Sequence, residues 1–200
     1  SDLQQADGQL VAAGYSYNGN DNDIAMVRYN SDGALDTTFN GTGKLSTAIG
    51  AWNDYAYSVI QQADGKLVVA GYSYNYISSN SDFALVRYNS DGSLDTTFNG
   101  TGKLTTAIGA SSSEDGAHSV LQQADGKLVV AGYSCSGSDY DFALVRYNSD
   151  GSLDTTFNGT GKLTTAIVSL TDQANSVIQQ ADGKLMVAGY SRKSNENDDF

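Results

Sequence analysis

The chain has no proline, and it has only one cysteine and one histidine among its 200 residues. The single cysteine, Cys135, excludes an intrachain disulfide framework. Together with His118 it supplies too few ligands for the usual zinc sites, which need three or four. No apolar run approaches the roughly 18 residues of a membrane-spanning helix, so we expect no insertion into a membrane.

Basic residues are also scarce. Eleven Lys and Arg stand against 23 Asp and Glu, which gives a formal net charge of −12. Nucleic acids and anionic membranes attract clustered cations, so we expect neither as a partner. Only two of the 23 acids are glutamate, Glu114 and Glu196, and the other 21 are aspartate, a residue that favours turns. With 22 glycines and 13 tyrosines, the composition indicates strands joined by turns.

What the sequence does contain is repetition, at a period of about 59 residues. The block Gln-Gln-Ala-Asp-Gly begins at Gln4, Gln61, Gln122 and Gln179. The block Val-Arg-Tyr-Asn begins at Val27, Val86 and Val145. We therefore interpret the chain as a single array of repeats: 1–50, 51–109, 110–168 and a partial fourth repeat, 169–200.

The sequence pattern of each repeat predicts four short strands, which we call A to D. In the second repeat they are Ser58–Gln62, Lys66–Ser73, Asp82–Tyr88 and Gly102–Ile108. An Asp-Gly pair between apolar runs, as between strands A and B, is a strong hairpin signal. The four segments are rich in β-branched and aromatic residues, and none has a helical period.

Strands B and C are apolar at consecutive rather than alternating positions, so both of their faces should be covered. Four-stranded antiparallel sheets packed face to face around an axis meet that requirement. The predicted fold is thus an all-β propeller with about three and a half blades in this chain. A β-solenoid is the alternative, and it is weaker because solenoid coils repeat at shorter periods.

The repeats differ in length at two connections only. Spacings from strand A to B and from C to D are constant, whereas the B–C and D–A loops vary. In a meander these two loops emerge at the same end of each sheet. Loops carry function on rigid scaffolds, so we expect the partner at this end, which we call the variable rim.

Residues 61–73 read Gln-Gln-Ala-Asp-Gly-Lys-Leu-Val-Val-Ala-Gly-Tyr-Ser, and residues 82–98 read Asp-Phe-Ala-Leu-Val-Arg-Tyr-Asn-Ser-Asp-Gly-Ser-Leu-Asp-Thr-Thr-Phe. This motif closely resembles the bacterial delta-60 repeat, and the resemblance covers essentially the whole chain. The chain departs from the family at Ala63, Ala124 and Ala181, where the family usually has proline. The resemblance implies a propeller-like fold in a secreted or surface protein, and the family's name often includes the words calcium-binding.

Aromatic residues gather in the predicted variable rim. We place three of them in a D–A loop and four in B–C loops: Trp52, Tyr55 and Tyr57, and Tyr17, Tyr74, Tyr76 and Tyr140. Exposed aromatic rings beside Asn and Asp are suited to stacking on sugars or to anchoring a protein partner. The alternative is that several of them pack beneath their own loops.

Acidic residues in the B–C loops are candidates for calcium binding, because calcium prefers clustered oxygen ligands. The candidates are Asp21, Asp23, Asp139, Asp141, Asp198 and Asp199. The second repeat has no such pair, and the spacing of an EF-hand loop is absent. Asx turns at the starts of strands are the favoured interpretation, and calcium is the one candidate cofactor.

An arginine recurs in strand C, with an aspartate eight positions later. The pairs are Arg28 and Asp36, Arg87 and Asp95, and Arg146 and Asp154. We expect structural arginine–carboxylate pairs of bidentate geometry that tie the C–D segment to its blade. Three equivalent anion sites are the alternative.

Catalytic groups are not evident. His118 falls in a predicted D–A loop where other repeats have Tyr57 and Asn175, and Cys135 falls at a variable loop position. A nucleophile and its base must converge, and most acids here recur in every repeat. We therefore expect a protein that is not an enzyme.

The fourth repeat stops at Phe200, within strand C, and the first begins within strand A. Open sheet edges and apolar faces favour association, so we expect further copies of the chain, or the rest of a longer repeat protein, as partners. These features predict an extracellular or bacterial surface module, structural or adhesive, whose variable rim binds a glycan or a protein. The alternative is self-assembly into a ring-closing dimer or an open polymer.

Overall fold

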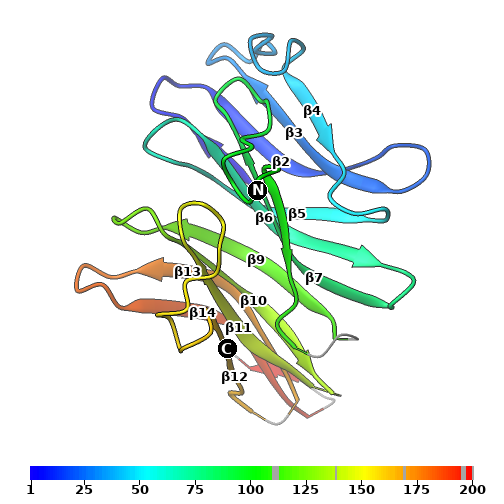
Figure 1. The fold of residues 1–200 in the computed structure, drawn as a ribbon, viewed down its shortest axis with the longest axis vertical. Coiled ribbons are helices and arrows are strands. Elements are labelled where there is room, and N and C mark those ends of the chain that lie inside the picture. The colour runs from blue at the N-terminus through cyan, green and yellow to red at the C-terminus, as the bar shows by residue number, and fades with distance from the viewer. Residues whose placement is uncertain (110–112, 138, 169, 195–196, 200) are drawn as a thin grey trace.

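The computed structural model describes residues 1–109, 113–137, 139–168, 170–194 and 197–199, in which all regular elements are β-strands (Figure 1). The first sheet contains β1 (Asp2–Gln4), β2 (Leu10–Tyr17), β3 (Asn22–Tyr29) and β4 (Lys44–Thr47). The second contains β5 (Asp54–Gln61), β6 (Leu67–Asn75), β7 (Asn80–Tyr88) and β8 (Lys103–Thr106). The third contains β9 (Asp115–Gln122), β10 (Leu128–Ser136), β11 (Asp139–Tyr147) and β12 (Lys162–Thr165). The remaining strands, β13 (Thr171–Gln179), β14 (Leu185–Ser194) and β15 (Asn197–Asp199), form the fourth blade and join this third sheet through one parallel pair, Tyr140 of β11 with Thr171 of β13.

Within each repeat, strands that are neighbours in sequence are neighbours in space and run antiparallel. Val69 of β6, for example, lies opposite Val59 of β5 and Val86 of β7. The A–B turn closes with a hydrogen bond from Gln62 N to Lys66 O of 2.8 Å, and Gly65 adopts the positive φ of 84° that this turn requires. The predicted four-stranded antiparallel blades are confirmed.

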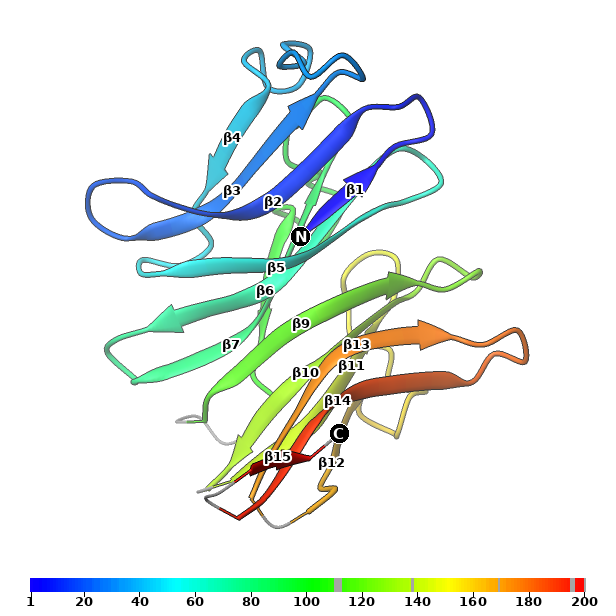
Figure 2. The same ribbon diagram turned by 180° about the vertical axis from the view of Figure 1, so that it is seen from behind.

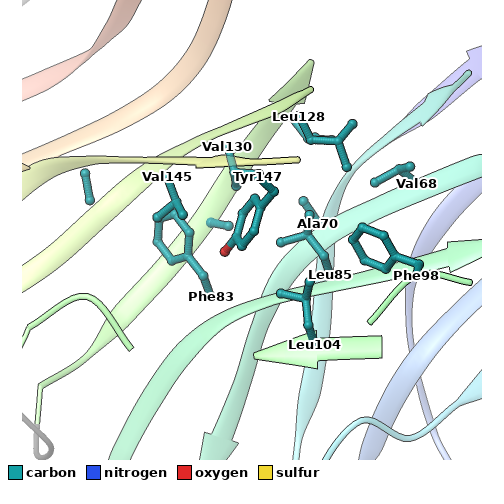
Figure 3. Packing of buried hydrophobic residues seen from close by; sticks show 13 residues of the cluster. Val68, Ala70, Phe83, Leu85, Phe98, Leu104, Leu128, Val130, Val145 and Tyr147 are labelled. Atoms are coloured by element: carbon teal, nitrogen blue, oxygen red, sulfur yellow. The ribbon is translucent and has the colours of Figure 1, made fainter. Parts of the chain in front are cut away.

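The blades pack face to face, which explains the consecutive apolar residues. Val68, on one face of the second blade, packs in a cluster with Val130 and Tyr147 of the third (Figure 3). Val69 and Val86, on the opposite face, pack against the first blade. Because both faces of a central blade are buried, the prediction of a propeller is confirmed over that of a solenoid.

The variable rim occupies one side of the molecule. In Figure 2 the β2–β3 and β6–β7 loops lie on the left, and the β5–β6 and β13–β14 hairpins lie on the right. The described part of the chain contains no helix long and apolar enough to span a membrane.

Three of the A strands, β5, β9 and β13, begin earlier than the sequence pattern predicts. β5 begins four residues before the predicted strand A, so Tyr55 and Tyr57 lie in a strand and not in the D–A loop. For the same reason His118 lies in β9. A β-bulge between Ala56 and Ser58 shifts the register and breaks the alternation that the prediction depends on.

The B and C strands are also longer than predicted. Tyr17 lies in β2, Tyr74 and Cys135 lie in β6 and β10, and Tyr140 lies in β11, so their predicted placement in loops is wrong. Strand pairing continues into the polar segment beyond the apolar run, as in the pairing of Tyr74 with Ser81.

Candidate functional site

Seven aromatic rings from three repeats form one unbroken series of contacts. We call this series the tyrosine row, and its members in order of contact are Tyr15, Tyr55, Tyr72, Tyr57, His118, Tyr133 and Tyr140. Successive ring centroids lie 4.8, 5.0, 5.7, 5.4, 5.4 and 5.2 Å apart. These distances fall in the range of favourable aromatic contacts.

The packing of neighbouring blades brings these rings together. β5 lies beside β9, so Tyr57 of the second repeat meets His118, which holds the same strand position in the third. Tyr72 and Tyr133 are also equivalent, and they occupy matching positions in β6 and β10. The row therefore crosses from blade to blade along the inner strands.

A glycine makes room for one ring of the row. The third repeat has Gly116 where the second has Tyr55. A Cβ atom on Gly116 would lie 2.6 Å from the ring of Tyr133, closer than side chains approach one another. Tyr133 therefore lies directly over the backbone of Gly116.

The tyrosine row is partly open to solvent. Tyr15 and Tyr57 are 55% and 40% exposed, and the other members are half-buried. Burial lowers the pKa of His118, whose Nδ1 lies 3.1 Å from Ala174 O, so this ring is neutral at pH 7. Burial also raises the pKa of the Tyr133 hydroxyl to about 12.

The structure brings three of the predicted rim aromatics into the row: Tyr55, Tyr57 and Tyr140. Sequence reasoning missed Tyr15, Tyr72 and Tyr133, because a residue that recurs in every repeat is readily ascribed to folding alone. The recurrence of Ala-Gly-Tyr at the end of each strand B nearest the variable rim is the pattern that could have indicated them.

A second aromatic cluster lies at the rim itself. The ring of Tyr76 contacts Trp52 and Tyr74, with centroid distances of 5.2 and 4.7 Å. Among the described ring contacts, none joins Tyr17 to this cluster or to the row. Tyr17 is 66% exposed, and its hydroxyl donates to Gly19 O at 3.0 Å.

The acidic candidates for calcium whose side chains the structure describes do not converge. Asn18 Nδ2 donates to both Asp21 and Asp23, which turns the first B–C loop back on itself. The other four candidates lie in β11 and β15: Asp139, Asp141, Asp198 and Asp199. The side chains of the last two fall outside the described part of the structure. Among the residues that the structure describes, no three His, Cys, Asp or Glu side chains are grouped closely enough to hold a metal ion.

The recurring arginine binds the aspartate eight residues later in all three repeats. The distance from Nε to Oδ2 is 2.7 Å in Arg28–Asp36, in Arg87–Asp95 and in Arg146–Asp154. The expectation of a bidentate pair is wrong, because only Nε of each arginine binds the aspartate and the other guanidinium nitrogens that donate have different acceptors. Nη1 of Arg87 donates to Ser149 O of the next repeat at 2.5 Å, and Nη2 donates to Thr97 Oγ1 at 3.1 Å. This arginine thus links two blades.

The fold should weaken in acid through these buried carboxylates. Burial acts to raise the pKa of Asp95, but hydrogen bonds from Thr97 and the nearby Arg87 outweigh it and lower this pKa from 3.8 to about 2. A carboxylate whose pKa is lowered by folding stabilises the fold above its unfolded pKa, and this stabilisation is lost as the pH falls through the folded value. We expect the urea midpoint to fall between about pH 4 and about pH 2, and Asp95→Asn to flatten that dependence. A midpoint with the same pH dependence in this variant would contradict the assignment.

Four segments of the chain match one family of protein domains: residues 5–39, 62–98, 123–157 and 180–200. The family is described as a beta-propeller domain of unknown function, DUF5122, and the matched segments cover more than half of the chain. The chain belongs to this family. Each complete match of the DUF5122 propeller runs from an A–B hairpin to a phenylalanine of the C–D segment, and the resemblance to the delta-60 repeat is confirmed. No curated protein matches the chain.

The DUF5122 propeller also resembles a solved structure, that of an endo-arabinase from Bacteroides thetaiotaomicron VPI-5482. The similarity covers 96% of this chain and 69% of the other, with a TM-score of 0.53 and 12% identity, which shows a common fold alone. The expectation that this chain is not an enzyme is nevertheless wrong as a conclusion from its recurring acids and its lack of converging groups. An enzyme has this same fold, so the fold does not exclude catalysis.

Proposed function

We propose that this propeller is an adhesive interaction module, extracellular or on a bacterial surface, and that it binds a carbohydrate chain along the tyrosine row. The observation that carries the proposal is the unbroken contact of seven rings across three repeats. Tyrosine combines an apolar ring face with a hydroxyl group, and both suit the surface of a sugar. A polymer of sugar units presents such a surface repeatedly, as the row does.

Charge favours a neutral carbohydrate. The chain carries a net charge of −12, which repels polyanions. A hydrogen-bond acceptor, the carboxylate of Glu114, lies at one end of the row, where its Oε2 accepts from the hydroxyl of Tyr140 at 2.6 Å. The exposed Glu114 carboxylate can also accept hydrogen bonds from the hydroxyl groups of a neutral sugar.

Loss of a ring from the row should weaken carbohydrate binding. We expect Tyr57→Ala and Tyr133→Ala each to lower the affinity about tenfold, which corresponds to about 1.4 kcal/mol. Affinity electrophoresis through gels that contain arabinan, xylan or a β-glucan measures the effect. Tyr17→Ala is the matched control, because Tyr17 is exposed and lies outside the row, and this variant should be retarded like the native chain.

Two results would overturn the proposal. The native chain could pass all three gels unretarded, or the two variants of the row could be retarded as strongly as the native chain. In either case a protein partner becomes the better hypothesis for the exposed aromatic residues.

Self-assembly is the second candidate, and the exposed blade faces favour it. Leu10 of the first blade is 44% exposed, whereas the equivalent Leu67 and Leu128 are buried against the preceding blade. Met186 of the last blade is 49% exposed, whereas the equivalent Val68 is buried against the next blade. These two kinds of face pack together at each junction inside the chain. We propose that they also pack between copies, or against further repeats of a longer protein.

The molar mass in solution tests this second candidate. A ring-closing dimer predicts twice 21.0 kDa by light scattering, and an open polymer predicts a larger mass that rises with concentration. Met186→Lys should return the mass to 21.0 kDa, because it places a charge on the exposed face. A native chain of 21.0 kDa at all concentrations would contradict self-assembly.

A further inference from the structure

We infer that a pocket beside Trp52, which we call the rim pocket, binds one terminal sugar unit of the carbohydrate that the tyrosine row holds. This inference rests on the proposed carbohydrate binding. The rim pocket has a volume of about 580 Å3. Its walls come from the D–A loop before β5, from the end of β6 and from β7 and β8, and they include Ile49, Trp52, Tyr74 and Leu104.

The aromatic walls are suited to one sugar ring. Tyr76 contacts both Trp52 and Tyr74 at interplanar angles of 76° and 82°, so the three rings support one another. Tryptophan offers the largest flat apolar face of any side chain together with one N–H donor. A pocket with such walls accepts the apolar face of a ring and a hydroxyl at its edge.

The remaining walls carry both an acceptor and a donor. Asp82 and Lys103 are among the residues that line the same pocket. Lys103 Nζ donates to Ala48 O at 2.9 Å, just before the loop that carries Trp52. Each hydroxyl of a sugar can donate to a carboxylate and accept from an ammonium. A neutral ligand with many hydroxyl groups can therefore form hydrogen bonds with both groups, whereas a cation or an anion is attracted by only one of them.

A buried carboxylate fixes the loop that carries Trp52. Asp54 is fully buried, and its Oδ2 accepts hydrogen bonds from Ile49 N at 2.7 Å and from Gly50 N at 3.3 Å. The loop is thus held in one conformation before a ligand arrives. Such preorganisation lowers the entropic cost of binding.

Asn53 joins the rim pocket to the tyrosine row. Its Nδ2 donates to the hydroxyl of Tyr76 at 3.1 Å, and its Oδ1 accepts from Asn22 Nδ2 at 3.2 Å. Asn22 Nδ2 also lies 3.4 Å from the hydroxyl of Tyr55, a member of the row. The polar contacts are continuous from one site to the other, so a carbohydrate chain on the row can end in the pocket.

The third repeat supplies a matched pocket without the aromatic walls. This pocket has a volume of about 420 Å3 and is lined by Asn158, Thr160 and Lys162, which are equivalent to residues of the rim pocket. The third repeat has Cys135 in place of Tyr74, and its D–A loop has no aromatic residue. The polar half of the pocket thus recurs, whereas the aromatic half is specific to the second repeat.

Titration of the 15N-labelled chain with free sugars tests the inference. The probes are arabinose, xylose, glucose, galactose and N-acetylglucosamine, each in the millimolar range. Trp52 is the only tryptophan, so the single indole N–H signal reports on this pocket without further assignment. We expect at least one probe to shift that signal. Tyr74→Cys should lower the affinity for that probe about tenfold. Lys162→Ala, in the matched pocket, should leave it unchanged.

The outcomes separate this inference from the proposed function. If no probe shifts the indole signal, or if Tyr74→Cys leaves the affinity unchanged, the inference that the rim pocket binds a sugar unit is wrong. Retardation in polysaccharide gels still tests binding along the tyrosine row. If a probe shifts the signal but the gels retard no form of the chain, the proposed function is wrong. The inference of a shared carbohydrate then falls with it.

Discussion

Replacement of Gly132 by alanine is expected to destabilise the fold by about 3 kcal/mol or more. A Cβ atom on Gly132 would lie 1.9 Å from Gly116 O and 2.9 Å from Ala117 Cα. Both are backbone atoms of β9, which pairs with β10 at this point through a β-bulge. A backbone atom cannot turn aside as a side chain can, so relief requires the β9–β10 ladder to open. Urea unfolding followed by circular dichroism measures the loss.

Gly14→Ala is the matched control for Gly132→Ala. Gly14 holds the equivalent position in the first repeat, but no atom lies within 4 Å of a Cβ added there. We expect unchanged or slightly increased stability, because alanine loses less backbone entropy on folding than glycine does. Equal losses at the two positions would contradict the close approach of β9 to β10.

Arg87→Ala is expected to cost about 3–5 kcal/mol, the range for removal of one partner from a buried ion pair. The substitution leaves the carboxylate of Asp95 buried without its closest cation. It also removes the bond to Ser149 O in the next blade and the packing of the guanidinium over Phe98, whose ring centroid lies 4.7 Å from Cζ. Urea unfolding again measures the change.

Arg146→Ala provides the comparison for Arg87→Ala. Arg146 binds Asp154 and lies over Phe157 in the same way. Its side chain is 20% exposed, against 6% for Arg87, and among the described residues it has no bond like the one to Ser149 O. We expect a smaller loss, about 1–2 kcal/mol. If Arg146→Ala costs as much as Arg87→Ala, the link between blades contributes nothing measurable.

The blade could be predicted because its determinants are local. The Asp-Gly turns and the consecutive apolar residues of strands B and C lie within one repeat, and the chain presents them several times. The full length of strand A could not be predicted. The bulge between Ala56 and Ser58 interrupts the alternation of side chains, and the strand continues beyond it.

The tyrosine row could not be predicted from spacing, because its contacts depend on how blades pack. Tyr57 and His118 belong to different repeats and meet only where β5 lies beside β9. The contact of Tyr133 with the backbone at Gly116 depends likewise on the pairing of β10 with β9. The first relation joins two repeats, and the second depends on a strand pairing within the third repeat that the spacing alone does not define, so the sequence suggests surface positions rather than a continuous row.

Binding of carbohydrate along the row is tested most directly by NMR of tyrosine rings labelled with 13C. The titrant is an oligosaccharide fragment of whichever polysaccharide retards the native chain. We predict that the ring signals of Tyr57 and Tyr133 shift together with one dissociation constant, while those of the buried Tyr88 and Tyr147 stay in place. Shifts confined to tyrosines outside the row, such as Tyr17, would contradict the proposed function.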